Sequence, residues 1–446
     1  MPASNSGTTR ITVLADSDTR WKWGALTASR LAGEGADKSA GADTRLDGRL
    51  LRGRATPTVR QLEEVGVRAD SLREVTAVEF LREVEREAPD VIVLALVGGA
   101  VQAVLHGLAR IAADSPGKRP VIVTGYVGVV YEKLADGLLL RHGADVVLAN
   151  SRQDAERFRA VYEGVGADAS GVVESALPFL GGAAYLEKGQ KHDPYTVVFA
   201  AQPSVPDSRA HRTYLLRRMV EHARLHPDRE VLIKLRSKPG EHTTHIEELP
   251  YQKLAKAEEL PPNCRLVYGN MGEVLDRTDL LVTVSSTAAL ESLHRRIPTA
   301  VLTDLGVREA LGNHHFIGSG CLASWDEIDA GYSPEAAPEW VARQGVAPDG
   351  TYETAFDAAR ERVASLLARP QLPPIAPYYS LTTAPGYLPG ILARHHLGPD
   401  GGPLPGAPAA DREPGPVRQA VRSAARGAYR HGVQRVAPVI RRMGEL

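Results

Sequence analysis

Strand-type and helix-type patterns alternate along most of this chain of 446 residues. In the first half, apolar and β-branched runs predict five strands, at residues 11–15, 91–97, 120–124, 146–149 and 172–174. Helical spacing lies between them, for example over 76–88 and 151–162. Because strands that are joined by helices pair in parallel, this alternation predicts a mostly parallel sheet covered by helices on both faces.

The same alternation restarts after a polar stretch at 181–193. It predicts five further strands, at residues 196–200, 231–235, 266–268, 280–284 and 299–303. The chain is therefore expected to be an α/β protein with two tandem Rossmann-like domains. Open α/β sheets bind ligands beyond the carboxyl ends of their strands, which predicts a central cleft that both domains face.

Shifts in composition mark the boundaries of the parts. We expect a first Rossmann-like domain at 1–183, a linker at 184–194, a second Rossmann-like domain at 195–370, a return segment at 371–397, a Pro/Gly-rich linker at 398–416 and a basic helical tail at 417–446. The uncharged stretch from Val91 to Ala109 has the length of a membrane span. Gly98 and Gly99 interrupt it, so it predicts a buried strand, a glycine turn and a helix instead.

Charge and cysteine content limit the classes of function. The formal charge is −1, which argues against a globally basic nucleic-acid binder. Residues 416–446 hold seven Arg and one Glu, so this tail carries +6 and leaves −7 on the rest. Arg recurs there every four residues, which predicts a basic amphipathic helix suited to an anionic membrane surface. The alternatives are a helix packed on the acidic body or a disordered tail. Cys264 and Cys321 form neither a disulfide framework nor a zinc pattern, which indicates a reducing compartment.

One strand-to-helix junction carries the strongest chemical signal. A hydrophobic strand runs into Ser285, Ser286 and Thr287, and a helix that contains Glu291 follows. Open backbone N–H groups and the helix dipole favour an anion at such a helix start, and a diphosphate fits there. Glu291 is placed to accept hydrogen bonds from a ribose. The alternative is an ordinary Ser/Thr N-cap followed by a solvated Glu.

This junction resembles the donor half of GT-B glycosyltransferases, in particular bacterial capsule-type transferases such as polysialyltransferases and glycerophosphotransferases. The resemblance rests on Ser-Ser-Thr-Ala-x-Leu-Glu at 285–291, followed by Arg-Ile-Pro-Thr at 296–299. Residues 144–151, 175–178 and 198–203 agree with it. The resemblance implies a nucleotide-activated donor on the second domain and an acceptor on the first, with no metal ion or other cofactor.

The loop after the strand at 231–235 departs from that resemblance. The capsule-type enzymes usually carry a His-Pro pair there, whereas this chain has Arg236 and Lys238. The missing His argues against a CMP-sialic acid donor. Arg236 and Lys238 are expected to supply positive charge to a phosphate leaving group, or else they form a solvated basic loop. His314, further along the chain, is a candidate contact for the donor phosphate or base.

The first half offers candidate groups for the acceptor. Asp16 and Asp18 follow the first strand, and one of them is expected to act as general base on an acceptor hydroxyl. Capping of the next helix and metal binding are the alternatives for this pair. Glu132 is a second candidate base. Residues near strand ends are expected to line the acceptor side: Gly98, Gly99 and Tyr126.

These expectations combine into a metal-independent glycosyltransferase. It would move a sugar, or a related group, from a nucleotide-activated donor to an acceptor, which the basic tail would suit if the acceptor belongs to the cell envelope. The expected location is the cytoplasm, at the inner face of the membrane if the tail binds it, and no nucleic acid is expected as a partner. Two other functions stay open: a nucleotide-sugar 2-epimerase, which shares the GT-B fold, and a non-catalytic nucleotide-sugar-binding protein.

Overall fold

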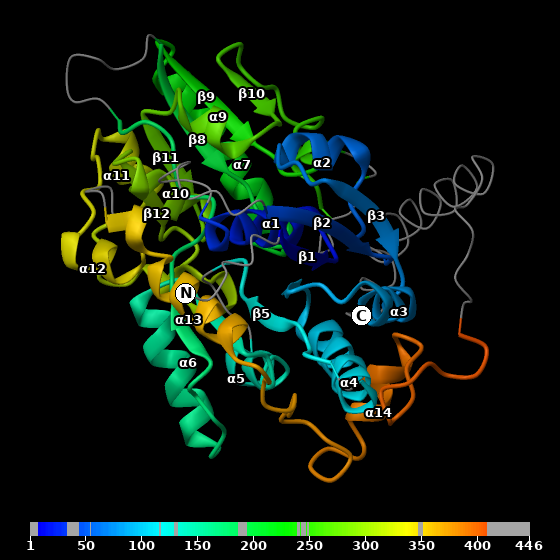
Figure 1. The fold of residues 1–446 in the computed structure, drawn as a ribbon. Helices are drawn as coiled ribbons and strands as arrows, with labels where there is room; N and C mark the ends of the chain where they lie inside the picture. The colour runs from blue at the N-terminus through cyan, green and yellow to red at the C-terminus, as the bar shows by residue number, and fades with distance from the viewer. Residues whose placement is uncertain are drawn as a thin grey trace. The chain divides into compact units, whose positions relative to one another are not determined.

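A computed structural model shows the fold of the chain (Figure 1). It describes residues 8–33, 44–53, 55–115, 117–128, 133–185, 194–238, 241, 247, 249–346 and 351–407. Glu132, the predicted tail at 417–446 and most of the predicted linker at 184–194 lie outside the described residues. No described helix is both long enough and apolar enough to cross a membrane.

The chain divides into two compact units. The first unit contains the described residues up to Phe179 and those from 351 to 407. The second unit contains the described residues from Leu180 to 346. The sequence analysis ended the second domain at 370 instead, so the helix that follows residue 351 belongs to the other unit.

The first unit is built on a seven-stranded parallel sheet in the order β3-β2-β1-β4-β5-β6-β7. Its strands are β1 (Thr9–Ala15), β2 (Thr44–Leu51), β3 (Ser71–Val75), β4 (Val91–Ala95), β5 (Val121–Gly125), β6 (Val146–Ala149) and β7 (Val172–Glu174). Its helices are α1 (Asp18–Leu31), α2 (Val59–Val65), α3 (Ala77–Glu87), α4 (Gly98–Asp114), α5 (Leu134–Leu139), α6 (Arg152–Gly164), α13 (Asp357–Ala368) and α14 (Leu388–Ala393), with a 3₁₀ turn, η3, at Thr351–Thr354.

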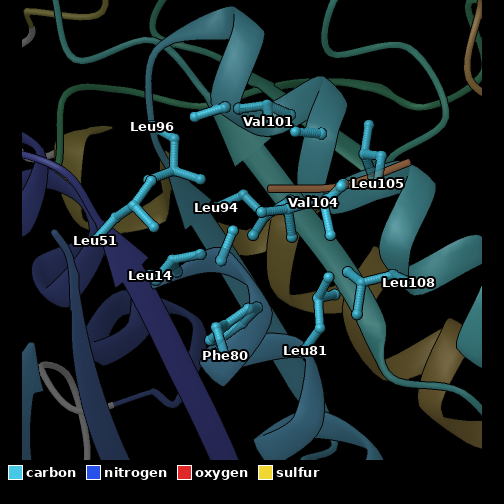
Figure 2. Packing of buried hydrophobic residues seen from close by; sticks show 14 of the residues in the cluster. Leu14, Leu51, Phe80, Leu81, Leu94, Leu96, Val101, Val104, Leu105 and Leu108 are labelled. Carbon is cyan, nitrogen blue, oxygen red and sulfur yellow. The ribbon is translucent and has the colours of Figure 1, made fainter. Parts of the chain in front are cut away.

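Alternate residues of the central strands enter separate cores on the two faces of this sheet. Leu14 and Leu94 pack against Phe80 of α3 and Val104 of α4 (Figure 2). Their neighbours in the strands, such as Val13, face the other way and pack with residues of α1 and α13. Each fully buried Leu, Val or Phe contributes about 1.5–3 kcal/mol to the free energy of unfolding. The predicted two-faced parallel sheet is confirmed.

The second unit is built on a six-stranded parallel sheet in the order β10-β9-β8-β11-β12-β13. Its strands are β8 (Tyr195–Ala200), β9 (Arg229–Lys234), β10 (Cys264–Val267), β11 (Leu280–Thr283), β12 (Thr299–Leu302) and β13 (Leu322–Ala323). Its helices are α7 (Arg209–Leu225), α8 (Tyr251–Leu254), α9 (Met271–Leu275), α10 (Ala288–His294), α11 (Trp325–Asp329) and α12 (Pro338–Arg343), with 3₁₀ turns η1 (Glu309–Leu311) and η2 (Asn313–Phe316). One face packs against α7, α8 and α11, and the other against α9 and α10.

Both sheets therefore have the Rossmann-like order, and the predicted fold class is confirmed. In each sheet the strand order reverses once, between β1 and β4 in the first and between β8 and β11 in the second. Loops leave the carboxyl ends of the strands in opposite directions at such a point, and the gap between them is where open α/β sheets bind ligands. We therefore expect the functional residues of each unit to lie at its switch point.

The described part of the predicted Pro/Gly-rich linker, residues 398–407, packs on the first unit. Gly398 donates its N–H to the carbonyl of Gly402 at 2.7 Å, and Leu404 donates to the carbonyl of His396 at 2.9 Å. Gly401 lies so close to the carbonyl of His106 that an added Cβ would meet it at 2.5 Å. This segment packs on α4 because its glycines permit that approach, and composition alone does not reveal it.

Candidate functional site

Asp16 lies at the switch point of the first sheet. It follows β1 directly, and its Oδ2 accepts a hydrogen bond from the backbone N–H of Val97 at 2.9 Å. Its Oδ1 accepts one from Nη1 of Arg20 in α1, also at 2.9 Å. Asp16 thus ties the end of β1 to the start of α4. Each carboxylate oxygen keeps a second lone pair, so the group can still receive a proton from a ligand.

Asp18 has a different position from Asp16. It is the first residue of α1, and the preceding Ser17 caps the helix by accepting the N–H of Arg20 at 3.4 Å. A carboxylate in the first turn is stabilised by the positive end of the helix dipole. Ser17, and not Asp18, is therefore the N-cap of α1, whereas Asp16 lies beside the next strand end.

The predicted acceptor-side residues surround a buried arginine that the sequence analysis missed. Gly98 and Gly99 begin α4, and Val97 gives this helix no side-chain cap. The Nη1 of Arg141 lies 3.4 Å from the position that a Cβ on Gly98 would take. The same guanidinium lies 4.0 Å from the ring centroid of Tyr126, and burial raises the pKa of that phenol. Gly98, Tyr126 and Arg141 therefore share one corner of the first unit.

His395 is a second residue that the sequence analysis missed. It follows α14, far along the chain from β1, yet the charge of Asp16 acts on it. Burial lowers the pKa of the His395 imidazole from its usual value, and the Asp16 charge opposes that shift. A neutral imidazole that can accept a proton therefore lies near Asp16 at pH 7. Only the fold brings the two together, because His395 and the adjacent His396 belong to no motif that would signal a site in the sequence.

Gln202 organises the switch point of the second sheet. It follows β8, and its Oε1 accepts the backbone N–H of Ser285 at 2.9 Å, while its Nε2 donates to the Ser285 hydroxyl at 3.1 Å. The Ser285 hydroxyl donates in turn to the carbonyl of Leu311 at 2.6 Å. Ser285 is buried, and these contacts use its polar groups within the protein. Through these contacts, Ser285 holds the loop after β11 in place.

The hydroxyl-rich turn after β11 is partly closed by its own side chains. The N–H of Ser286 donates to the Thr283 hydroxyl at 3.1 Å, and the N–H of Ala288 donates to the Ser286 hydroxyl at 3.2 Å. Among the described residues, the N–H of Thr287 has no hydrogen-bond acceptor. Glu291 is 8% exposed in α10, so it is not the solvated residue of the alternative reading. The turn offers Ser286 and Thr287 as its accessible polar groups.

Arg236 and Lys238 follow β9, next to β8 in the sheet. Arg236 is half-buried, and its charge acts on Glu247, a carboxylate whose pKa is raised by burial. Arg212 of α7 pairs with the same Glu247 at 2.8 Å. Lys238 is exposed, and its backbone N–H donates to Glu241 at 2.8 Å. The two basic residues therefore differ: the Lys238 side chain is solvated, whereas Arg236 lies against a buried ionic network.

His314 is exposed on η2, after β12. Its neighbour Asn313 is buried and fixes the loop, with Nδ2 donating to the carbonyls of Leu302 at 3.0 Å and Gly306 at 2.8 Å. The loop is thus held firmly while the His314 ring faces solvent. Among the described residues, no hydrogen bond or ion pair joins His314 to the turn after β11.

One group of potential metal ligands occurs among the described residues. It consists of His222 and His226 near the end of α7 and Asp329 of α11, with ligand atoms within 4.8 Å of one another. The Nδ1 of His222 lies 2.6 Å from Asp329, and Arg218 pairs with that carboxylate at 2.9 Å. Arg218 therefore competes with a cation for the carboxylate. The cluster lies at the carboxyl end of α7, away from the strand ends that carry the candidate residues.

Comparison with known families gives one match that spans most of the chain. Residues 11–366 match the family model described as "Putative glycosyltransferase (DUF6716)". This range includes both sheets and α10, and it ends within α13. No curated protein matches the chain.

Several solved structures are similar in fold. The Staphylococcus aureus protein MnaA, solved with UDP, shares 13% identity over 80% of this chain and 95% of its own, with a TM-score of 0.49. A UDP-GlcNAc 2-epimerase from Neisseria meningitidis, bound to UDP-GlcNAc, shares 10% over 80% and 99%, with a TM-score of 0.44. The spinosyn rhamnosyltransferase SpnG shares 13% over 81% and 97%, with a TM-score of 0.43. At sequence identities this low, the similarity is one of fold alone.

Proposed function

The chain belongs to the DUF6716 family of putative glycosyltransferases, and from this premise we propose that it transfers a sugar from a nucleotide-activated donor to an acceptor hydroxyl. The observation that carries the proposal is the extent of the family match, which covers both parallel sheets and both switch points. Polar side chains at the carboxyl ends of the central strands support it, because open α/β sheets bind ligands there.

The donor is assigned to the second unit, at the turn after β11. The hydroxyl of Ser286 and the N–H of Thr287 would receive the diphosphate, since both are accessible there. Arg236 and Lys238 would add positive charge as the leaving phosphate develops negative charge. Ser285 positions the turn, Glu291 would face the ribose, and His314 is assigned to the donor phosphate or base. The thermal-shift screen described below identifies the nucleotide and the sugar of the donor.

The acceptor is assigned to the first unit, at the switch point beside Asp16. We keep Asp16, rather than Asp18, as the proposed base, because its carboxylate lies between the ends of β1 and β4. His395 is a second group near it that can take a proton. Gly98, Gly99 and Tyr126 would line this side. Glu132 lies outside the described residues and stays a candidate from sequence alone.

The scheme uses no metal ion or cofactor, since N–H dipoles and arginine charge can stabilise a leaving diphosphate. We further propose a cytoplasmic location and an envelope-associated acceptor, with residues 417–446 bringing the enzyme to an anionic membrane surface. The proposed location rests on the cysteine content, and the proposed acceptor rests on the arginine spacing of the tail.

The test has two steps. Thermal-shift screening of the whole chain with UDP-, GDP-, dTDP- and CMP-sugars identifies the donor by its stabilisation of the folded state. The selected donor is then incubated with candidate hydroxyl acceptors in EDTA, and nucleotide release and acceptor mass are measured. A transferase gives free nucleotide together with a glycosylated acceptor. An isomerised donor without acceptor would instead identify an epimerase, and binding without turnover would identify a non-catalytic protein.

A further inference from the structure

Arg141 is a buried cation without an ion-pair partner in the described part of the chain. Its side chain is 4% exposed, and its guanidinium donates to the carbonyls of Gly125 at 3.0 Å, Gly137 at 2.7 Å and Leu96 at 3.2 Å. These three hydrogen bonds use three of its five N–H groups. The partners are neutral, so the charge itself is not balanced by contact.

A buried charge of this kind is costly unless an opposite charge compensates it. Asp16 attracts the Arg141 charge through space, but Arg20 repels it and already pairs with Asp16 at 2.9 Å. Arg20 therefore offsets the attraction of Asp16 for the Arg141 charge. Since no carboxylate among the described residues pairs with the Arg141 guanidinium, its charge favours an anion nearby.

The start of α4 adds a second feature that favours an anion. This helix has 17 residues, and Val97 supplies no side-chain cap. The N–H of Val97 is taken by Asp16. Those of Gly98 and Gly99 have no acceptor among the described residues. Both glycines are half-exposed, and the positive end of the helix dipole lies at this point.

The two features meet at Gly98. A Cβ on this residue would lie 3.4 Å from Nη1 of Arg141 and 2.9 Å from Leu140, so the close approach requires glycine. A Cβ on Gly99 would meet nothing closer than Ile391, at 3.8 Å. The backbone of the first turn is therefore open on the Gly99 side and backed by the guanidinium on the Gly98 side.

We propose that this corner binds an oxyanion group of the ligand of the first unit, a phosphate or a carboxylate, on the N–H groups of Gly98 and Gly99 with Arg141 behind them. The proposed function makes the acceptor the ligand of the first unit. Resting on that function, we infer that the acceptor carries a phosphate or a carboxylate group. The anion site itself does not depend on that step, because it can be measured without turnover.

The experiment compares Gly99→Asp with Gly99→Asn in the full chain. The open space at Gly99 accommodates either side chain, and only Asp brings a carboxylate to compete for the site. Thermal shifts are recorded against inorganic phosphate, methyl phosphate and acetate at constant ionic strength, so that general salt effects cancel. Inorganic phosphate could also bind the turn after β11 in the second unit. Ser286→Leu is the control that separates such binding from binding at Gly98 and Gly99.

The proposal predicts that the wild-type chain, Gly99→Asn and Ser286→Leu are stabilised by at least one of these anions. In Gly99→Asp the apparent affinity for that anion falls at least tenfold. Methyl phosphate and acetate decide whether the site takes a phosphate or a carboxylate. Arg141→Met, if it folds, shows the same loss.

Equal shifts in Gly99→Asp and Gly99→Asn, a shift lost only in Ser286→Leu, or no shift in the wild-type chain would each overturn the anion site. Failure of glycosyl transfer with a normal anion shift would instead contradict the proposed function and leave the site in place.

Discussion

Gln202 holds Ser285 by two hydrogen bonds, accepting its backbone N–H at 2.9 Å and donating to its hydroxyl at 3.1 Å. The contact joins the loop after β8 to the loop after β11, across the switch point of the second sheet. Asp16 and Val97 make the equivalent contact in the first sheet. In both units, a side chain that follows the first strand fixes the loop on the other side of the switch point.

Loss of the contact between Gln202 and Ser285 should lower the free energy of unfolding. Gln202→Ala removes the acceptor of a buried N–H, and an unsatisfied buried group costs about 1–3 kcal/mol of the free energy of unfolding. Gln371→Ala, at an exposed position, is the matched control and should change this free energy by no more than about 0.5 kcal/mol. Urea denaturation compares the two, and equal stabilities would mean that Gln202 does not hold the turn.

Substitutions of Asp16 and Asp18 should have different effects on the turnover rate. Asp16→Asn keeps an acceptor for the Val97 N–H but removes the proposed base, so the rate should fall roughly 100-fold or more with donor affinity unchanged. Asp18→Asn removes a charge from the first turn of α1, worth about 0.3–1 kcal/mol of stability, and leaves the proposed base in place. Steady-state kinetics with calorimetric donor binding measures both effects. Full activity in both variants would remove the end of β1 from the mechanism.

His395 gives a prediction about pH. Burial lowers its pKa from 6.5, and the anionic Asp16 opposes that shift by stabilising the imidazolium. Asp16→Asn removes the anion, so the pKa of His395 should fall further. Histidine-selective NMR titration measures this pKa, with His395→Gln to assign the signal. A pKa above 6.5, or an unchanged pKa in Asp16→Asn, would contradict the assigned environment.

The same shift predicts how His395 affects folding. The unfolded chain takes up the proton more readily than the folded chain, so protonation favours unfolding. This contribution to stability is present above pH 6.5 and decreases as the pH falls below that value. His395→Gln should therefore weaken the loss of stability on acidification, which urea denaturation at several pH values would show.

The tail prediction rests on sequence alone, since residues 417–446 lie outside the described part. Arg418, Arg422, Arg426 and Arg430 would each contribute about 1 kcal/mol near an anionic surface. The full chain should sediment with anionic vesicles at low salt, and a chain that ends at Pro416 should not. Equal sedimentation of the two, or none by either, would exclude this membrane role.

The sequence predicted the parts of the fold that depend on local hydrophobicity. Central strands such as β4 and β11 are buried on both faces, so they appear as continuous apolar runs. The edge strand β3 has the sequence Ser-Leu-Arg-Glu-Val and is mostly exposed, so no such run marks it. The return of α13 to the first unit depends on contacts between residues far apart in the chain, which periodicity does not encode.

The candidate sites divide in the same way. Ser286 and Thr287 could be found because a strand, a hydroxyl cluster and a helix follow one another in the sequence. Arg141 and His395 could not, because neither belongs to a sequence motif and each reaches Tyr126 or Asp16 only by folding. The hydrogen bonds that already occupy Ser285 were also invisible, since its contact with Gln202 spans 83 residues and its contact with Leu311 spans 26.

The most direct test is a calorimetric titration of the stabilising nucleotide into the wild-type chain, Ser286→Ala and Ser286→Leu. Each lost phosphate contact should cost about 1–3 kcal/mol, so Ser286→Leu, which also fills the space beside Thr287, should bind at least tenfold more weakly than wild type. Ser286→Ala, which removes the hydroxyl and keeps the space, should lie between them. Unchanged affinity in folded Ser286→Leu would contradict the central claim that the turn after β11 binds the activated donor.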